Sequence, residues 1–529
     1  MASERGSKRD NGRAVGAGLA LAVVAGGLLG AAPAQAAGEV PGCSRQALET
    51  GGVKVICTLE AVYQADTVLK GTDGADVFVV RGGRFADDED GEAPEGAVLG
   101  IEGGEGDDRI EVYSEMPVTV RSGGGDDVVV AGGGASSRYE TGAGNDRIIA
   151  FTVLGPDGVI DAGEGEDTVL GTASAGTISG GPGNDALTLT GGTGDGSQAT
   201  TLAGPFVGEL ADEGVPAAMK ITATGPTNSG RLEGGAGDDT LKLTGADRQS
   251  VNSGTIDASA GHDTVTVTAG IEYGAEAVGP AANTGRIEAG DSDITATGGL
   301  GGPFGAGGPA NAATGTINGG RSLTLTGGRG GSHRGDGGTA NAGTLTGAAT
   351  ARLTGGDGSG GGEHRSGGGG TANTGTVHTT GDLTLTGGNG AQGRSGNNGS
   401  NTTYRGGGGT RGGDGGTGNT GTATTDTGTL TVTGGNGGNG GTGGNAHHSA
   451  SSAVDTGGDG GAGGNGAPAN TGHLHTPTTP TVTGGQPGTG GTAGHGPGGI
   501  GSADGTAGTN GNPGPAHTPD ATLNNQPTT

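Results

Sequence analysis

The sequence predicts an all-β fold: a parallel β-roll or β-helix solenoid of stacked Gly-x-Gly-x-Asp repeats, continuing into a degenerate glycine-rich solenoid. The 529-residue chain contains 136 Gly and 21 Pro but only five Phe, five Tyr and no Trp, so it lacks the bulky residues that fill an ordinary globular core. Such a composition indicates disorder when it has no period and a repeat architecture when it has one. Short runs of alternating apolar residues follow glycine-rich turns throughout the chain, and this alternation is typical of strands.

The N-terminus has the features of a secretory signal peptide over residues 1–36. Basic residues precede an apolar run over 14–32, and Ala34-Gln35-Ala36 fits a small-residue cleavage site. The alternative is a retained membrane anchor, which the cleavage site disfavours. Because no second hydrophobic stretch follows, we expect no membrane span after cleavage and a secreted or extracellular protein.

Residues 37–69 are interpreted as an N-terminal capping segment. Its two cysteines, Cys43 and Cys57, are the only ones in the chain and stand 14 residues apart. In an exported chain such a pair is expected to form a disulfide, whereas a metal site is disfavoured because no His lies nearby. The disulfide would stabilise the fold by roughly 3 kcal/mol and close the N-terminal end of the repeat stack.

The charge of the chain is strongly negative and localised. The formal net charge is −29, and 45 of the 55 Asp and Glu lie before residue 301. This balance argues against nucleic acid and anionic membranes as partners, because both require basic patches. It favours a metal cation; the alternative is a contribution to solubility alone.

A repeated motif occupies residues 70–270, the predicted calcium-binding solenoid. The pattern G-x-G-x-D-x-U, with U a large apolar residue, occurs six times, and its central Asp residues are spaced 19, 19, 21 and 18 residues apart. This interval suits one coil of two short strands and two turns, so that successive acidic turns stack along one edge. Glycines allow the tight turn angles that direct carbonyls inward, and Asp adds a hard charged oxygen. Since calcium prefers six to eight oxygens at about 2.3–2.6 Å, two stacked turns could share one ion.

Residues 70–267 resemble the hemolysin-type, or RTX, calcium-binding repeats of exported bacterial proteins. The resemblance implies a parallel β-roll, calcium between stacked turns and folding after export. It implies side-chain ligands at Asp108, Asp127, Asp146, Asp167, Asp185 and Asp239. It implies turn-forming, carbonyl-donating residues at Gly104, Gly106, Gly123, Gly125, Gly142, Gly144, Gly163, Gly165, Gly181, Gly183, Gly235 and Gly237.

Two further copies of the motif are imperfect. Asp76 and Asp263 are candidate ligands in turns where Thr72 and Ser259 replace a glycine. The chain also departs from the family, whose repeats recur every nine residues and bind ions along both edges, so only one edge is expected to carry calcium here. The 54-residue gap between Asp185 and Asp239 puts pairing across it in doubt.

Residues 271–484 contain degenerate glycine-rich repeats. Six segments share a frame that ends in alternating Thr and apolar residues followed by Gly-Gly, with glycine-rich inserts such as GGNGGNGGTGGN over 434–445. We expect the same coil with its acidic turn lost; the alternative is a disordered glycine tail. Residues 485–529 lack strand signal and frame, and we expect them to be disordered.

No catalytic apparatus is apparent in the sequence. The repeats begin about 34 residues after the cleavage site, and neither H-E-x-x-H nor G-x-S-x-G occurs. We therefore expect a non-enzymatic, secreted protein that binds calcium ions and couples them to folding. The alternative is an adhesive or cell-envelope structural solenoid with a surface partner, in which calcium only rigidifies the rod.

Overall fold

The computed structural model describes residues 40–86, 94–150, 154–191, 225–245, 247–360, 366–400, 405–447, 456–496, 503–517 and 522–524. The predicted signal segment lies outside these ranges. All regular structure within them is β-strand, so the described part of the chain offers no apolar helix that could cross a membrane.

The strands form two long sheets, which we call sheet I and sheet II, and one short pair, β3 (Val62–Tyr63) with β6 (Arg84–Phe85). Sheet I has sixteen strands: β1 (Cys43–Ala47), β2 (Val53–Cys57), β5 (Val77–Val80), β8 (Arg109–Tyr113), β10 (Val128–Gly132), β12 (Arg147–Ala150), β14 (Thr168–Gly171), β16 (Ala186–Thr190), β18 (Thr240–Thr244), β20 (Thr264–Thr268), β22 (Asp293–Thr297), β24 (Ser322–Thr326), β26 (Thr350–Thr354), β28 (Leu383–Thr386), β30 (Leu430–Thr433) and β32 (Thr481–Thr483). Sheet II has fifteen: β4 (Val68–Lys70), β7 (Leu99–Glu105), β9 (Val118–Gly124), β11 (Arg138–Ala143), β13 (Val159–Asp161), β15 (Thr177–Pro182), β17 (Arg231–Ala236), β19 (Thr255–Asp257), β21 (Arg286–Gly290), β23 (Thr316–Gly319), β25 (Thr344–Ala348), β27 (Thr376–Thr379), β29 (Thr422–Thr425), β31 (His473–His475) and β33 (Thr522–Asn524).

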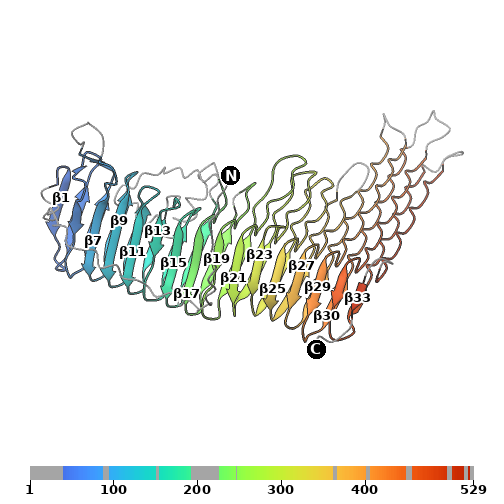
Figure 1. The fold of residues 1–529 in the computed structure, drawn as a ribbon. Helices are drawn as coiled ribbons and strands as arrows, with labels where there is room; N and C mark the ends of the chain where they lie inside the picture. The colour runs from blue at the N-terminus through green and yellow to red at the C-terminus, as the bar shows by residue number, and fades with distance from the viewer. Residues whose placement is uncertain are drawn as a thin grey trace, which may run out of the picture. The chain divides into compact units, whose positions relative to one another are not determined.

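The chain alternates between the two sheets, so each coil contributes one strand to each (Figure 1). Every strand pairs in parallel with the strand one coil later, apart from the antiparallel pair β1–β2. The apolar U positions fall in register: Ile110 lies beside Val129, and Val129 beside Ile148. The predicted all-β solenoid is confirmed, and it continues through the glycine-rich half up to β32 and β33.

The hydrophobic core lies between the two sheets as a continuous ladder of small and medium side chains. Strands such as β16 bury alternate residues, with Leu187 and Leu189 facing inward and threonines facing outward. One buried cluster extends from Val40 to Leu474. A thin coil needs only one layer of Val, Ile or Leu from each sheet, which explains how a chain with so few aromatic residues buries a core.

The N-terminal end of the stack is closed by β1 and β2. The predicted disulfide is confirmed: Cys43 and Cys57 are bonded and lie opposite each other in the antiparallel pair. β2 then pairs with β5, so the disulfide fixes the first strand of sheet I to the second.

The edge of the coils opposite the acidic turns contains a buried ladder of asparagines. From Asn228 to Asn419, each side-chain Nδ2 donates to Oδ1 of the asparagine in the next coil at 2.8 Å, as Asn283 does to Asn311. The Nδ2 of Asn470, the last member, lies 3.5 Å from His517 Nδ1. Each also donates to nearby backbone carbonyls, as Asn283 does to Gly285 at 3.2 Å. The ladder comprises Asn228, Asn252, Asn283, Asn311, Asn341, Asn373, Asn419 and Asn470, all fully buried. Paired amides satisfy one another without charge, so the ladder holds the coils in register where no aspartates are present.

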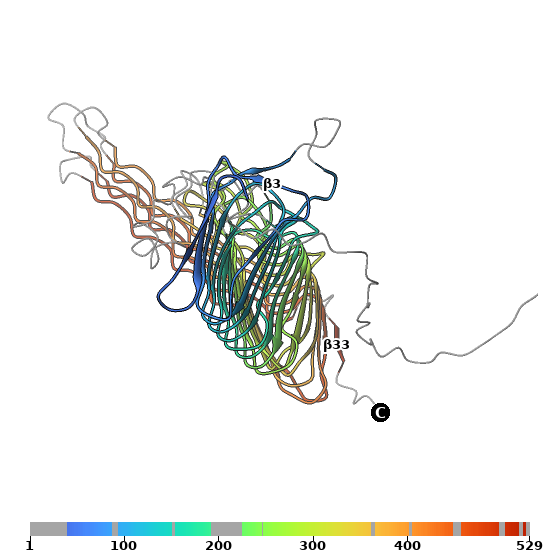
Figure 2. The same cartoon turned by 90° about the vertical axis from the view of Figure 1, so that its left-hand side faces the viewer.

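The glycine-rich inserts form an ordered array that extends away from the two sheets (Figure 2). Its hydrogen bonds repeat every third residue: the amides of Gly435, Gly438 and Gly441 donate to one neighbouring segment, and those of Gly437 and Gly440 to another. A three-residue period without internal hydrogen bonds is typical of polyproline II helices, and here the bonds run between segments instead.

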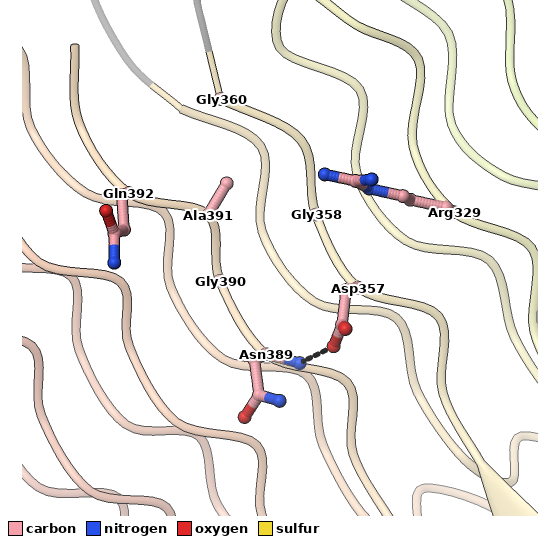
Figure 3. A pocket seen from close by; sticks show the side chains of 8 residues that line it. All are labelled: Arg329, Asp357, Gly358, Gly360, Asn389, Gly390, Ala391 and Gln392. Atoms are coloured by element: carbon pink, nitrogen blue, oxygen red, sulfur yellow. Dashed lines mark hydrogen bonds between the residues drawn. The ribbon is translucent and has the colours of Figure 1, made fainter.

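Glycine is required in this array because the segments are in close contact. A Cβ on Gly441 would lie 1.9 Å from the carbonyl oxygen of Arg394, and one on Gly438 would lie 1.9 Å from that of Ala391. At several positions a side chain also accepts an amide of the array: Asp357 Oδ1 accepts the amide of Asn389 at 2.8 Å beside a depression in the array (Figure 3). Three glycines are among the eight residues that line the depression, and its one carboxylate, that of Asp357, already has this partner.

The structure differs from the sequence prediction beyond Gly484, where disorder was expected. Segments 485–496 and 503–517 belong to the same array: Gly488 donates to Gly464, and Gly511 donates to Gly488. Order in these two segments comes from the glycine triplets and not from strands. The glycine amides donate hydrogen bonds to neighbouring segments, whereas a helix of this kind has no internal hydrogen bonds.

Candidate metal-binding aspartate column

Each coil of the N-terminal half passes from sheet II to sheet I through the Gly-x-Gly-x-Asp turn. All twelve motif glycines have φ between +98° and +150°, a region that L-residues rarely adopt. They also pack against the preceding coil: a Cβ on Gly142 would lie 2.0 Å from the carbonyl oxygen of Gly123, and one on Gly163 would lie 1.9 Å from that of Gly142. The motif glycines therefore form the turns, and their carbonyls stack from coil to coil, as the sequence predicts for these positions.

The motif aspartates lie directly above one another inside this edge, and we call them the aspartate column. The column comprises Asp76, Asp108, Asp127, Asp146, Asp167, Asp185, Asp239 and Asp263, each at most 2% exposed. From Asp108 onward, each Oδ1 accepts the backbone amide of the preceding aspartate; the amide of Asp127, for example, donates to Asp146 Oδ1 at 2.8 Å. The predicted stacking of acidic turns on one edge is thus present, and the other edge carries the neutral asparagine ladder.

The column is continuous across the long insert. The amide of Asp185 donates to Asp239 Oδ1 at 2.8 Å, although 54 residues separate them. β16 pairs directly with β18, placing Leu187 beside Leu241. The doubt raised by the insert is therefore resolved, because the described residues on its two sides stack in register.

The second carboxylate oxygen divides the column into two groups. Oδ2 is buried and has no hydrogen-bond partner in the six full motifs, at Asp108, Asp127, Asp146, Asp167, Asp185 and Asp239. In the imperfect motifs this oxygen is satisfied: Asp76 Oδ2 accepts the Thr72 amide at 2.6 Å, and Asp263 Oδ2 accepts the Ser292 hydroxyl at 2.9 Å. Burying a charged oxygen without a hydrogen-bond partner costs free energy. The six unpaired Oδ2 atoms, which we call the orphaned oxygens, are therefore the positions where the described residues leave this cost uncompensated.

Burial and mutual repulsion raise the pKa of these carboxyls. Burial is the larger cause and raises the pKa of Asp108 and Asp167 to about 7, with neighbouring column aspartates adding to the effect. Burial likewise raises the pKa of Asp127, Asp185 and Asp239 to about 6 and that of Asp146 above its ordinary value. The hydrogen bond to Oδ1 opposes this shift, as do the Ser122 hydroxyl beside Asp127 and the Thr141 hydroxyl beside Asp146, but none of them cancels it. At neutral pH the column holds a negative charge that a cation would stabilise.

Three glycines leave room beside the orphaned oxygens. A Cβ on Gly103 would lie 2.0 Å from Asp108 Oδ2 and 2.4 Å from the carbonyl oxygen of Ser122 in the next coil. The equivalent point at Gly180 is 2.4 Å from both Asp185 Oδ2 and the Gly234 carbonyl oxygen. At Gly234 the two distances are 2.5 Å to Asp239 Oδ2 and 2.8 Å to the Ala258 carbonyl. A charged oxygen and a carbonyl oxygen of the next coil thus converge beside each glycine, a donor set that suits a hard cation.

Comparison of the chain with protein-family models, curated proteins and solved structures returned no match. Function is therefore inferred from the geometry of this chain alone.

The described residues contain no group of three or more His, Cys, Asp or Glu arranged to hold a metal ion. The column offers one carboxylate per coil, so most oxygens for an ion would come from backbone carbonyls. Sequence reasoning identified every member of the column but missed the position two residues after the buried apolar residue of each sheet II strand. In coil order this position is occupied by Gly103, Ser122, Thr141, Ala162, Gly180 and Gly234. The only signal was the first glycine of Gly-Gly-x-Gly-x-Asp, which half of the copies lack.

Proposed function

We propose that the protein is a non-enzymatic, secreted calcium-binding solenoid in which calcium ions bind along the aspartate column and stabilise its folded state. The observation that carries the proposal is the set of six buried Oδ2 atoms without partners, one for each full motif. Asp108, Asp127, Asp146, Asp167, Asp185 and Asp239 would supply the charged ligands, and glycine carbonyls of adjacent coils would supply neutral ones. A divalent ion would neutralise carboxylates that otherwise repel one another at about 4.8 Å spacing.

Calcium fits this donor set better than a transition metal. All available donors are oxygens, and no His or Cys side chain belongs to the column. Hard oxygen donors in a flexible number suit calcium, whereas imidazole and thiolate select zinc or copper. Extracellular calcium sites bind at about 10⁻⁴–10⁻³ M, so several weak sites along one stack would respond to calcium outside the cell.

Coupling to folding follows from the same electrostatics. Without the ion, the buried carboxylates favour the unfolded chain, where water solvates them. At ten times its dissociation constant, each bound ion would add about 1.4 kcal/mol to the folded state. Five or six such ions would match the stability of an ordinary domain.

Calorimetric titration of the chelator-treated full chain tests the proposal. We expect calcium to bind at several sites with dissociation constants of about 10⁻⁴–10⁻³ M and magnesium to bind much more weakly, because magnesium demands a smaller, regular octahedron. Absence of calcium binding to a chain that is folded by circular dichroism would refute the proposal.

The C-terminal half supports a second candidate, a cell-envelope or adhesive solenoid in which calcium only rigidifies the rod. The observation that favours it is that the coils from β22 onward continue without the aspartate column, held by the asparagine ladder. Fractionation of producing cells distinguishes the two: envelope-bound protein supports the structural role, and wholly free protein in the medium contradicts it.

A further inference from the structure

The outward face of sheet I carries two registered ranks of threonine. The outer rank, at the end of each strand, is threonine in all nine strands from β16 to β32, and the inner rank is threonine in seven of them. The outer rank comprises Thr190, Thr244, Thr268, Thr297, Thr326, Thr354, Thr386, Thr433 and Thr483. The inner rank comprises Thr188, Thr266, Thr295, Thr324, Thr384, Thr431 and Thr481, with Lys242 and Arg352 at the other two positions. We call these sixteen residues the threonine face.

The hydroxyls of the threonine face have no hydrogen-bond partner among the described residues, although many other threonines do. Thr379 Oγ1, for example, donates to the Gly381 carbonyl at 2.9 Å. The face is partly or fully exposed along its length. It therefore presents a two-dimensional set of hydroxyl and methyl groups to whatever lies outside.

The spacing of this set is fixed by the backbone. Neighbouring strands lie about 4.8 Å apart, and alternate residues of one strand about 6.6 Å apart, so the two ranks form a regular lattice about 38 Å long. Threonine is stiff at χ1, which limits the positions of each hydroxyl and methyl. The buried asparagine ladder holds the same coils in register at the edge opposite the acidic turns.

The threonine content exceeds what strand preference and solubility require. Strand preference alone would fill outward positions of both sheets with β-branched residues. In the same coils, however, sheet II carries ion pairs: Arg231 with Asp257 and with Glu233, and Arg286 with Glu288. Sheet II also has registered outward threonines, at Thr316, Thr344, Thr376 and Thr422, but over only four neighbouring strands. The two ranks of sheet I run through nine described strands, and Lys242 and Arg352 are their only charged positions.

We propose that the threonine face binds the surface of crystalline ice. A regular lattice of hydroxyls and methyls can order the water between them into a layer that matches a repeating crystal, because water-mediated hydrogen bonds are nearly as favourable as direct ones. Other repeating ligands fit less well. A polysaccharide would need aromatic platforms, a mineral would need rows of carboxylates and an anionic membrane would need rows of basic residues, none of which the face provides. The proposal is independent of calcium binding, because most of the face belongs to coils beyond the aspartate column.

Ice-growth assays on the full chain with matched variants test the proposal. The variant Thr268→Lys with Thr326→Lys places two large charged side chains in the outer rank, two strands apart. The control Thr316→Lys with Thr376→Lys adds the same charge to outward positions of sheet II at the same strand separation. Circular dichroism and thermal midpoints verify that all three proteins are folded.

The expected result is that the wild-type chain shapes ice crystals and inhibits recrystallisation, that the sheet I variant loses most of this activity and that the sheet II control keeps it. A folded wild-type chain without effect on ice, or equal losses in both variants, would overturn the proposal. Sedimentation that shows a dimer dissociated only by the sheet I variant, without ice activity, would also overturn it and assign the face to a second copy of the chain.

Discussion

Replacing Asp167 by asparagine should change stability in opposite directions with and without calcium. Asparagine keeps an Oδ1 that can accept the Asp146 amide, which the carboxylate accepts at 2.7 Å, but removes the buried charge. Burial raises the pKa of Asp167 to about 7, against about 3.9 in an unfolded chain. Ionisation therefore destabilises the metal-free fold by about 4 kcal/mol at pH 7.5, about 1.5 kcal/mol at pH 5 and almost nothing at pH 3.

The sign follows from linkage. A carboxyl whose pKa is raised by folding is more protonated in the folded state, so the metal-free protein loses stability as pH rises from about 4 through 7. Asp167→Asn should remove the contribution of this carboxyl to the loss of stability with rising pH. It should therefore raise the thermal midpoint in chelator at pH 7.5 and have little effect at pH 3. In calcium the variant should gain less than the wild type, by about 1.4 kcal/mol for each ion the carboxylate serves at ten times the dissociation constant.

Thermal unfolding at pH 3, 5 and 7.5, with chelator or with millimolar calcium, measures both effects. Asp157→Asn is the control, because Asp157 lies exposed in the opposite turn and should change neither quantity. A variant less stable than the wild type in chelator at pH 7.5 would refute the electrostatic reasoning, since it would mean that the carboxylate acts only as a structural hydrogen-bond acceptor.

Three further changes test separate parts of the structure. Gly180→Ala should weaken calcium binding in calorimetry, because its Cβ would lie 2.4 Å from both Asp185 Oδ2 and the Gly234 carbonyl oxygen; unchanged binding in a variant that is folded by circular dichroism would contradict the site. Asn341→Ala should lower the free energy of unfolding by about 2–3 kcal/mol in denaturant titration, equally with and without calcium, since it breaks a buried ladder; a calcium-dependent loss would be unexpected. Gly441→Ala should abolish amide protection in the glycine array but leave the sheets intact in hydrogen exchange, because the Cβ would meet a carbonyl oxygen at 1.9 Å; protection equal to the wild type would argue against the close packing.

Much of the N-terminal half could be predicted because one short motif specifies turn, register and charge together. The glycines of the motif require positive φ, and the apolar residue after Asp fixes which face is buried, so Asp108, Asp127 and Asp146 had to stack. The sequence could not predict which Oδ2 atoms have a hydrogen-bond partner. The partner of Asp263 Oδ2 is the Ser292 hydroxyl, which belongs to the following coil and to no motif.

The C-terminal half was harder to predict because its order depends on contacts between distant segments. Asparagine in Asn-Thr-Gly is a common turn residue, so the sequence alone does not distinguish it from a buried ladder member such as Asn373. A Gly-Gly-x helix makes no internal hydrogen bonds. Its stability comes from hydrogen bonds between segments such as 434–445 and 484–496, and the sequence alone does not show which segments are neighbours.

Crystallography of the protein with calcium, using anomalous scattering, tests the central claim most directly. The expected result is a row of ions along the aspartate column, each within calcium–oxygen bonding distance of an Oδ2 atom of Asp108, Asp127, Asp146, Asp167, Asp185 or Asp239. A structure in millimolar calcium with no anomalous peak at these oxygens would contradict it.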